Sequence, residues 1–131
     1  MKLFPMLLLI CIAAFKTKAQ IHIATDSILL VSVSKTQLTP LASDSLCSSF
    51  FIVIPGEVKL HYHASHTENV IVMEGTGIMK LGENDIKIKK GDLIVIPKGT
   101  KHAVKNTGEI PLKVISVQSP YFDGKDRVFV D

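Results

Sequence analysis

The sequence predicts an all-β sandwich or barrel, and two observations carry that prediction. Short apolar and β-branched stretches recur along the 131-residue chain, and glycine, proline and asparagine residues that favour turns stand between them. No long stretch repeats its apolar residues with helical spacing. Hydrophobic residues make up 47% and charged residues 21% of the chain, a balance that excludes a disordered or collagen-like protein.

The expected strands follow one another along the chain, and each is apolar or β-branched and bounded by turn residues. They are Ile28–Val33; Phe50–Ile54, closed by Pro55 and Gly56; Val58–His63; Glu68–Met73, closed by Gly75; Ile78–Leu81, closed by Gly82; Ile86–Ile88, closed by Gly91; Leu93–Ile96, closed by Pro97; Lys101–Lys105, closed by Asn106; and Leu112–Val117.

The organisation that we expect is a single domain behind a leader. Residues 1–19 are the leader, 20–49 hold N-terminal strands and a linker, 50–118 form the barrel core and 119–131 form a tail. No repeat or low-complexity tract divides this region further.

The leader has the pattern of a secretory signal peptide. Lys2 precedes an apolar run from Leu3 to Phe15, and the small residue Ala19 follows it. This run is too short for the ~20 residues that a membrane-spanning helix needs. We therefore expect cleavage after Ala19, no membrane association afterwards, and a secreted or periplasmic protein.

The charge balance after cleavage excludes one class of partner. Three of the 15 Lys and Arg residues lie in the leader, which leaves 12 basic against 12 acidic residues. We therefore expect no nucleic-acid partner. Cys47 becomes the only thiol, so stability must come from packing and not from an internal disulfide.

Two expected strands are apolar on both faces. Val70 and Val72 alternate with Ile71 and Met73, and Leu93–Ile96 is apolar throughout. Such strands need cover on both sides. Either the segment Ile28–Val33 or a second copy of the chain supplies the outer cover, and we expect a homodimer.

Four side chains have the chemistry of a metal site. His61 and His63 share one face of a strand, and a turn through residues 64–67 returns Glu68 beside them. His102 starts a later strand and can project inward. A histidine pair is ordinarily exposed or hydrogen-bonded, but Glu68 precedes an apolar stretch where an uncompensated charge is costly. Three imidazoles and a carboxylate suit a divalent metal and leave one or two coordination positions open.

At these residues the sequence resembles the cupin superfamily, whose motifs are G(X)5HXH(X)3–4E(X)6G and G(X)5PXG(X)2H(X)3N. The second motif is matched from Gly91 to Asn106 and the first from His61 to Gly75, with its opening glycine displaced by one position to Gly56. The resemblance implies a double-stranded β-helix, or jelly roll, that is usually dimeric and binds its metal at His61, His63, Glu68 and His102. Zn, Mn, Cu, Fe and Ni all occur in the family, and an oxidising compartment favours Zn, Mn or Cu.

Further residues near this motif are candidates for contacts with a ligand. His66 lies in the turn between His63 and Glu68, where it is either a catalytic proton carrier or a solvent-facing loop residue. In the tail, Tyr121, Asp123 and Arg127 either contact a ligand at the barrel mouth or tie down the sheet edge.

Two functions are compatible with these residues. The first is a metal-dependent enzyme that oxygenates, isomerises or decarboxylates a small oxygen-rich molecule chelated by the metal. The second is a non-catalytic secreted binding module for a sugar, a phenolic compound or a metal ion.

Overall fold

The structure is a computed structural model of the chain, and it describes residues 21–32 and 34–130. The predicted signal peptide over residues 1–19 lies outside the described residues. Within them, no helix has both the length and the apolar character needed to cross a membrane.

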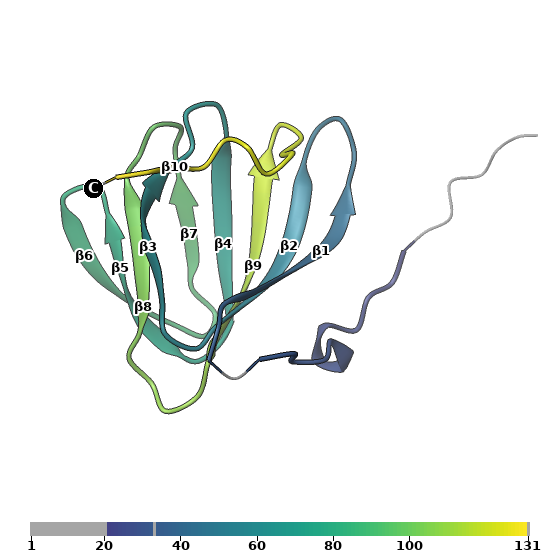
Figure 1. Ribbon diagram of the computed structural model, residues 1–131, viewed down its shortest axis with the longest axis vertical. Coiled ribbons are helices and arrows are strands. Elements are labelled where there is room, and N and C mark those ends of the chain that lie inside the picture. Colours follow the sequence, from purple (N-terminus) through teal and green to yellow (C-terminus); the bar gives the residue numbers. More distant parts are fainter. Residues whose placement is uncertain (1–20, 33, 131) are drawn as a thin grey trace, which may run out of the picture.

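Two antiparallel five-stranded sheets face each other in the described part of the chain (Figure 1). The first sheet has the order β1 (Gln37–Ser43), β2 (Ser48–Ile54), β9 (Leu112–Ser119), β4 (Thr67–Glu74) and β7 (Leu93–Ile96). The second has the order β10 (Val128–Phe129), β3 (Glu57–Tyr62), β8 (His102–Asn106), β5 (Thr76–Leu81) and β6 (Asn84–Lys89). The predicted all-β, single-domain fold is confirmed.

The core lies between the two sheets and follows the strand alternation. Val70 and Val72 of β4 pair across to Ser116 and Val114 of β9, so these side chains share the inner face. From the opposite sheet, Met79, Ile88 and Val104 pack against them. Burying such a side chain contributes about 1.5–3 kcal/mol each, and these contacts hold the two sheets together without a disulfide.

The prediction of a strand at Ile28–Val33 is wrong, because residues 28–32 form no strand. The side chain of Gln37 accepts a hydrogen bond from the Val31 amide and donates one to the Leu29 carbonyl. These backbone groups therefore have a side-chain partner instead of a neighbouring strand. A 3₁₀ turn, Thr25–Ser27, precedes the segment.

The N-terminal segment still covers part of the outer face of the first sheet. Residues 25–30 border a surface hollow together with Phe51, Val53 and Met73, and Phe51 and Val53 are buried. The cover does not extend to β7, where Leu93 is 61% and Val95 51% exposed. The outer apolar face is thus only partly covered.

Two observed strands were not expected from the apolar pattern. β1 contains Pro40, which has no amide proton for a ladder, and β1 accordingly lies at the edge of its sheet. β10 has only two residues, which pair with Tyr62 and His61 of β3. Figure 1 shows the chain after β9 crossing one end of the sandwich to reach this position.

Candidate metal centre

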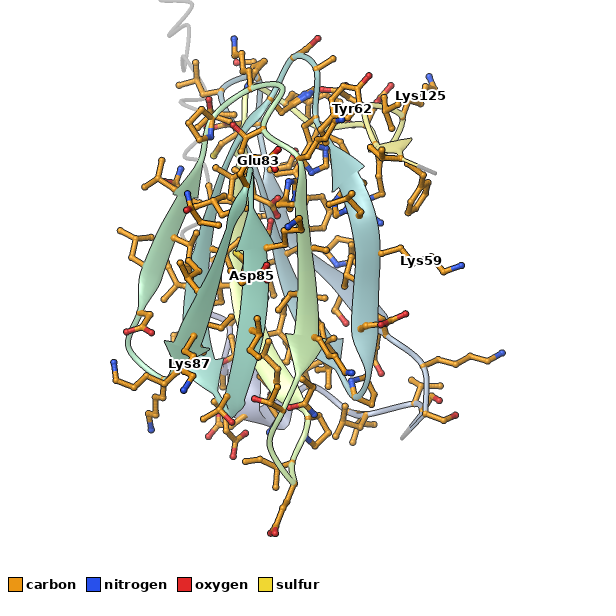
Figure 2. The ribbon with its side chains drawn as sticks, turned by 90° about the vertical axis from the view of Figure 1, so that its left-hand side faces the viewer. Lys59, Tyr62, Glu83, Asp85, Lys87 and Lys125 are labelled. Carbon is orange, nitrogen blue, oxygen red and sulfur yellow. The ribbon has the colours of Figure 1, made fainter. Side chains whose placement is uncertain are left out.

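A β-bulge in β3 sets the direction of its histidine. Val58 pairs with Val104 and His61 pairs with His102, so three steps along β3 match two steps along β8. The extra residue lets Val58 and His61 both face the interior, although strict alternation would turn one of them outward. Lys59 lies in the bulge, and its side chain points away from the barrel into solvent (Figure 2).

The structure brings together the four side chains that we expected to bind a metal. One ring nitrogen from each of His61, His63 and His102 lies within 4.8 Å of the others. Glu68 reaches them from the opposite sheet, with its Oε2 atom 3.3 Å from His63 Nε2 and 3.2 Å from His102 Nε2. All four residues are buried.

In each of the three clustered histidines, one ring nitrogen forms a hydrogen bond with a backbone carbonyl. Nδ1 of His61 donates to the Lys59 carbonyl at 2.8 Å, and Nδ1 of His102 donates to the Thr100 carbonyl at 2.9 Å. Nδ1 of His63 donates to the Asp126 carbonyl. A carbonyl oxygen can only accept, so Nδ1 carries the proton and Nε2 of the neutral ring is a lone-pair acceptor.

The cluster therefore brings together hydrogen-bond acceptors: the Nε2 atoms of the histidines and the carboxylate of Glu68. Nε2 of His63 and Nε2 of His102 are buried without a hydrogen-bond donor among the described residues. The Glu68 carboxylate, which lies 3.2–3.3 Å from both atoms, is also an acceptor when ionised. Unpaired buried acceptors cost about 1–3 kcal/mol each, and a divalent cation satisfies all of them at once. The donor set thus fits a metal, and the three histidines could hold one.

The pKa values of His61, His63 and Glu68 are shifted by burial and by the contacts that these residues make within the cluster. Burial alone would lower the pKa of His63, but its contacts with Glu68 and the Asp126 carbonyl outweigh burial and raise it. Burial would raise the pKa of Glu68, yet His102, His63 and Ser116 hold it far below its usual value. Burial lowers the pKa of His61 to about 4 against the opposing Lys59 carbonyl. At neutral pH, Glu68 is ionised and His61 is neutral, as metal ligands must be.

Ser116 supports this site, and the sequence analysis missed it. It lies fully buried on β9 and donates its hydroxyl hydrogen bond to Glu68 Oε1. The available signal was alternation, because Ser116 is a polar residue on the inward face shared with Leu112 and Val114. Its donor holds the carboxylate so that Oε2 faces the histidines.

His66 contacts the tail and not the cavity. Its Nδ1 lies 2.5 Å from Asp126 Oδ2, and its Nε2 donates to the Tyr121 carbonyl at 3.0 Å. The solvent-facing alternative is wrong, because His66 is only 8% exposed. The catalytic role of His66 stays a prediction, and neither ring nitrogen faces the metal ligands in this arrangement.

Asp126 fastens the tail to the turn after His63. Its carboxylate accepts hydrogen bonds from the Ala64 and Ser65 amides, both at 2.8 Å. These hydrogen bonds, with His66, lower the pKa of Asp126 to about 2 although its burial acts in the opposite direction. Because the carbonyl of the same residue orients His63, fixing the tail also fixes a metal ligand.

A cavity of about 360 Å³ opens from the candidate metal centre into the barrel. His61, Glu68 and His102 line it together with mostly aliphatic side chains from both sheets. Of the three tail candidates, Arg127 lines this cavity. Tyr121 is exposed, and Asp123 forms an ion pair with Lys125 at 3.1 Å. The tail therefore ties down the edge of β3 and also contributes to the cavity wall.

Replacing Ser116 tests its support of Glu68. We expect Ser116→Ala to weaken metal binding by about 10- to 100-fold, because the carboxylate loses the donor that orients it. Isothermal titration with Zn²⁺ or Mn²⁺ measures the effect. Ser49→Ala is the matched control, since Ser49 contacts the Ala42 carbonyl on the neighbouring edge strand. Equal affinities for Ser116→Ala and the native chain would contradict the role.

Replacing Asp126 tests the attachment of the tail. Asp126→Ala removes the acceptor of two backbone amides, so we expect hydrogen exchange at Ala64 and Ser65 to accelerate by at least about 10-fold. The control is Asp123→Ala, which removes an exposed tail carboxylate paired with Lys125. Unchanged protection of both amides in Asp126→Ala would show that other contacts hold the tail.

The sequence is similar to that of known proteins and matches one protein family. Residues 49–118 match the Cupin domain family model. A protein of Aquifex aeolicus is 35% identical over 100 residues, which cover 76% of this chain and 82% of that protein. Mannose-1-phosphate guanylyltransferase RfbM of Salmonella typhimurium is 35% identical over 79 residues, or 58% of this chain. The match covers only 16% of that transferase.

A solved structure extends the likeness to the whole fold. The crystal structure of a protein with a double-stranded β-helix domain from Klebsiella pneumoniae superposes with a TM-score of 0.73 at 19% identity. The superposition covers 87% of this chain and 99% of that one. The family match over more than half of the sequence and the two facing antiparallel sheets show that this chain belongs to the cupin family and has the double-stranded β-helix fold.

Proposed function

We propose that this cupin is a metal-dependent enzyme that acts on a small oxygen-rich molecule. The observation that carries the proposal is the convergence of three imidazole nitrogens and a carboxylate beside a cavity of about 360 Å³, whose wall includes His61, Glu68 and His102. A pocket of this size suits a small metabolite. A bound divalent metal would supply Lewis acidity, which polarises a substrate oxygen and stabilises negative charge that develops on it.

The chain's own residues hold the metal and shape the site. His61, His63, His102 and Glu68 would bind the ion, which could be Zn, Mn, Cu, Fe or Ni, since this donor set suits each of them. Aliphatic side chains of both sheets line the rest of the cavity and keep its local dielectric low. Oxygenation, isomerisation and decarboxylation of a chelated substrate are the reactions compatible with such a site.

One observation favours the non-catalytic alternative, a binding module for a sugar, a phenolic compound or a metal ion. Both ring nitrogens of His66 are engaged by the tail. The histidine closest in sequence to the metal ligands is thus not presented to the cavity as a proton carrier. Product formation by the metal-loaded protein distinguishes the two functions, because a binding module forms no product.

Metal analysis tests the proposal. Protein purified without chelators and loaded with metal should contain about one divalent ion per chain, since the four donors form one site. His61→Ala combined with His102→Ala should abolish this signal in elemental analysis, while His22→Ala, which removes an exposed histidine, should keep it. Circular dichroism confirms that each variant is folded. A native chain that binds no ion, or a double variant that retains it, refutes the metal centre.

Turnover assays on the loaded protein then separate the two functions. We expect a mixed pool of phenolic compounds, hydroxy acids and sugar acids to yield a product detected by mass spectrometry, with dioxygen consumption followed in parallel. Retention of one compound without product formation would favour the binding module over the enzyme.

We also propose that the protein is exported to the periplasm or the exterior and works as a homodimer. The leader pattern of residues 1–19 supports export. The dimer is supported by the uncovered apolar residues of β7, Leu93 and Val95, which lie on a strand at the edge of its sheet in the described part of the chain. The same apolar patch on a second copy, related by a two-fold axis, would supply the missing cover for these side chains.

A charge placed on β7 tests the dimer. Val95→Lys should raise the dimer dissociation constant by at least about 10-fold, because each copy would bury a charge in an apolar contact. Sedimentation velocity over a concentration series measures the change. Ile78→Lys is the control, since Ile78 is an exposed residue of similar size on the other sheet. A native chain that is monomeric at every concentration would contradict the proposal.

A further inference from the structure

Arg127 brings a positive charge to the cavity beside the candidate metal centre. It follows Asp126, which is fastened to the turn after His63, and it precedes β10, where Phe129 pairs with His61. These neighbours fix its backbone on both sides. Its side chain lines the same cavity as His61, Glu68 and His102, and its charge lowers the pKa of His61 and opposes protonation of His63.

The guanidinium of Arg127 has no protein partner among the described residues. Its Nε atom is buried and makes no hydrogen bond, and no described carboxylate lies within ion-pair distance of it. The two nearby carboxylates are engaged elsewhere: Glu68 contacts the histidines and Ser116, and Asp126 contacts the turn and His66.

The remaining acidic residue of the cavity wall is too distant to pair with Arg127. Glu57 begins β3 four residues before His61, a separation of about 13 Å along the strand. The buried Nε–H donor of Arg127 has no acceptor in the described part of the chain, and an unsatisfied buried donor is costly. This arrangement is suited to a partner that arrives with the ligand.

The rest of the cavity indicates what that ligand looks like. Leu38, Ile52, Val58 and Met79 line other parts of the same wall and offer no polar side-chain group. Lys59 also borders the cavity, but its side chain points into solvent (Figure 2). The cavity thus combines one inward cation with an apolar surface, which suits a monoanion with an apolar body better than a neutral sugar or a doubly charged phosphate.

We propose that this site takes a small monocarboxylic acid with an apolar body, and that Arg127 recognises its carboxylate. The planar guanidinium offers two parallel N–H donors that match a carboxylate. An oxygen next to the carboxylate would then lie toward the metal ligands, while the apolar body contacts the aliphatic wall. This inference rests on the proposed function, because it names the substrate class of the same site.

Binding measurements on the whole protein test the assignment. Mandelate is the probe, and mandelamide is its neutral counterpart with the same aromatic body. Isothermal titration of the metal-loaded protein should show that mandelate binds and that mandelamide binds at least about 10-fold more weakly. In Arg127→Gln, the affinity for mandelate should fall by about 10- to 100-fold, and the affinity for mandelamide should not change, because a charge-assisted pair is lost.

Two further variants keep the experiment decisive. Arg127→Lys retains the charge without the planar fork, so it should recover part of the affinity for mandelate. Lys125→Gln removes a neighbouring tail cation whose side chain is 87% exposed, and it should bind mandelate as the native chain does. Equal loss of mandelate affinity in Lys125→Gln and Arg127→Gln would show that the affinity depends on the total positive charge of the tail. That result would overturn the assignment.

The outcomes also separate this inference from the proposed function. Arg127→Gln should retain the full metal content, because Arg127 is not a ligand. If the native chain holds metal but binds mandelate no better than mandelamide, or if Arg127→Gln binds it equally well, the carboxylate assignment fails and the metal centre stands. If the native chain binds no metal, the proposed function fails, and Arg127-dependent binding of mandelate would still support the carboxylate site.

Discussion

The candidate site depends on three imidazole rings whose Nδ1 protons are all committed to backbone carbonyls. Lys59, Thr100 and Asp126 supply those carbonyls, so the direction of every Nε2 lone pair follows from the course of the main chain. The Glu68 carboxylate then faces two of these lone pairs at 3.2 and 3.3 Å. Acceptors at that separation repel one another unless a positive charge lies among them. Affinity for a cation is therefore a property of the folded backbone as much as of the histidines.

Both sheets contribute residues to this cluster. His61 and His102 face each other across neighbouring strands of one sheet, whereas Glu68 and its supporting Ser116 come from the other. The distance between the carboxylate and the rings is consequently set by how closely the sheets pack. The buried aliphatic residues that fix this packing, such as Val70 and Val104, also fix the metal site. Core packing and site geometry are coupled here, since close-packed interiors transmit displacements.

The sequence predicted the features that depend on local pattern, and it missed those that depend on distant contacts. Alternation and turn residues located β2 to β9, and ligand chemistry singled out His61, His63, Glu68 and His102. The largely apolar stretch Ile28–Val33 resembled a strand, but the side chain of Gln37 forms hydrogen bonds with its backbone. Ser116 and Asp126 could not be connected to the site because each acts on a residue at least 48 positions away.

The tail explains why those distant contacts matter for function. Within a few residues it supplies the carbonyl that orients His63, the carboxylate that caps the turn before Glu68, and the one guanidinium in the cavity wall. Phe122 packs against the rings of His63 and His66, and Phe129 packs against His61. A segment with so many contacts to the ligands cannot change its position without altering both the metal site and the cavity. Substrate recognition and ligand geometry therefore depend on the same short stretch of chain, which crosses the end of the barrel where the metal ligands lie.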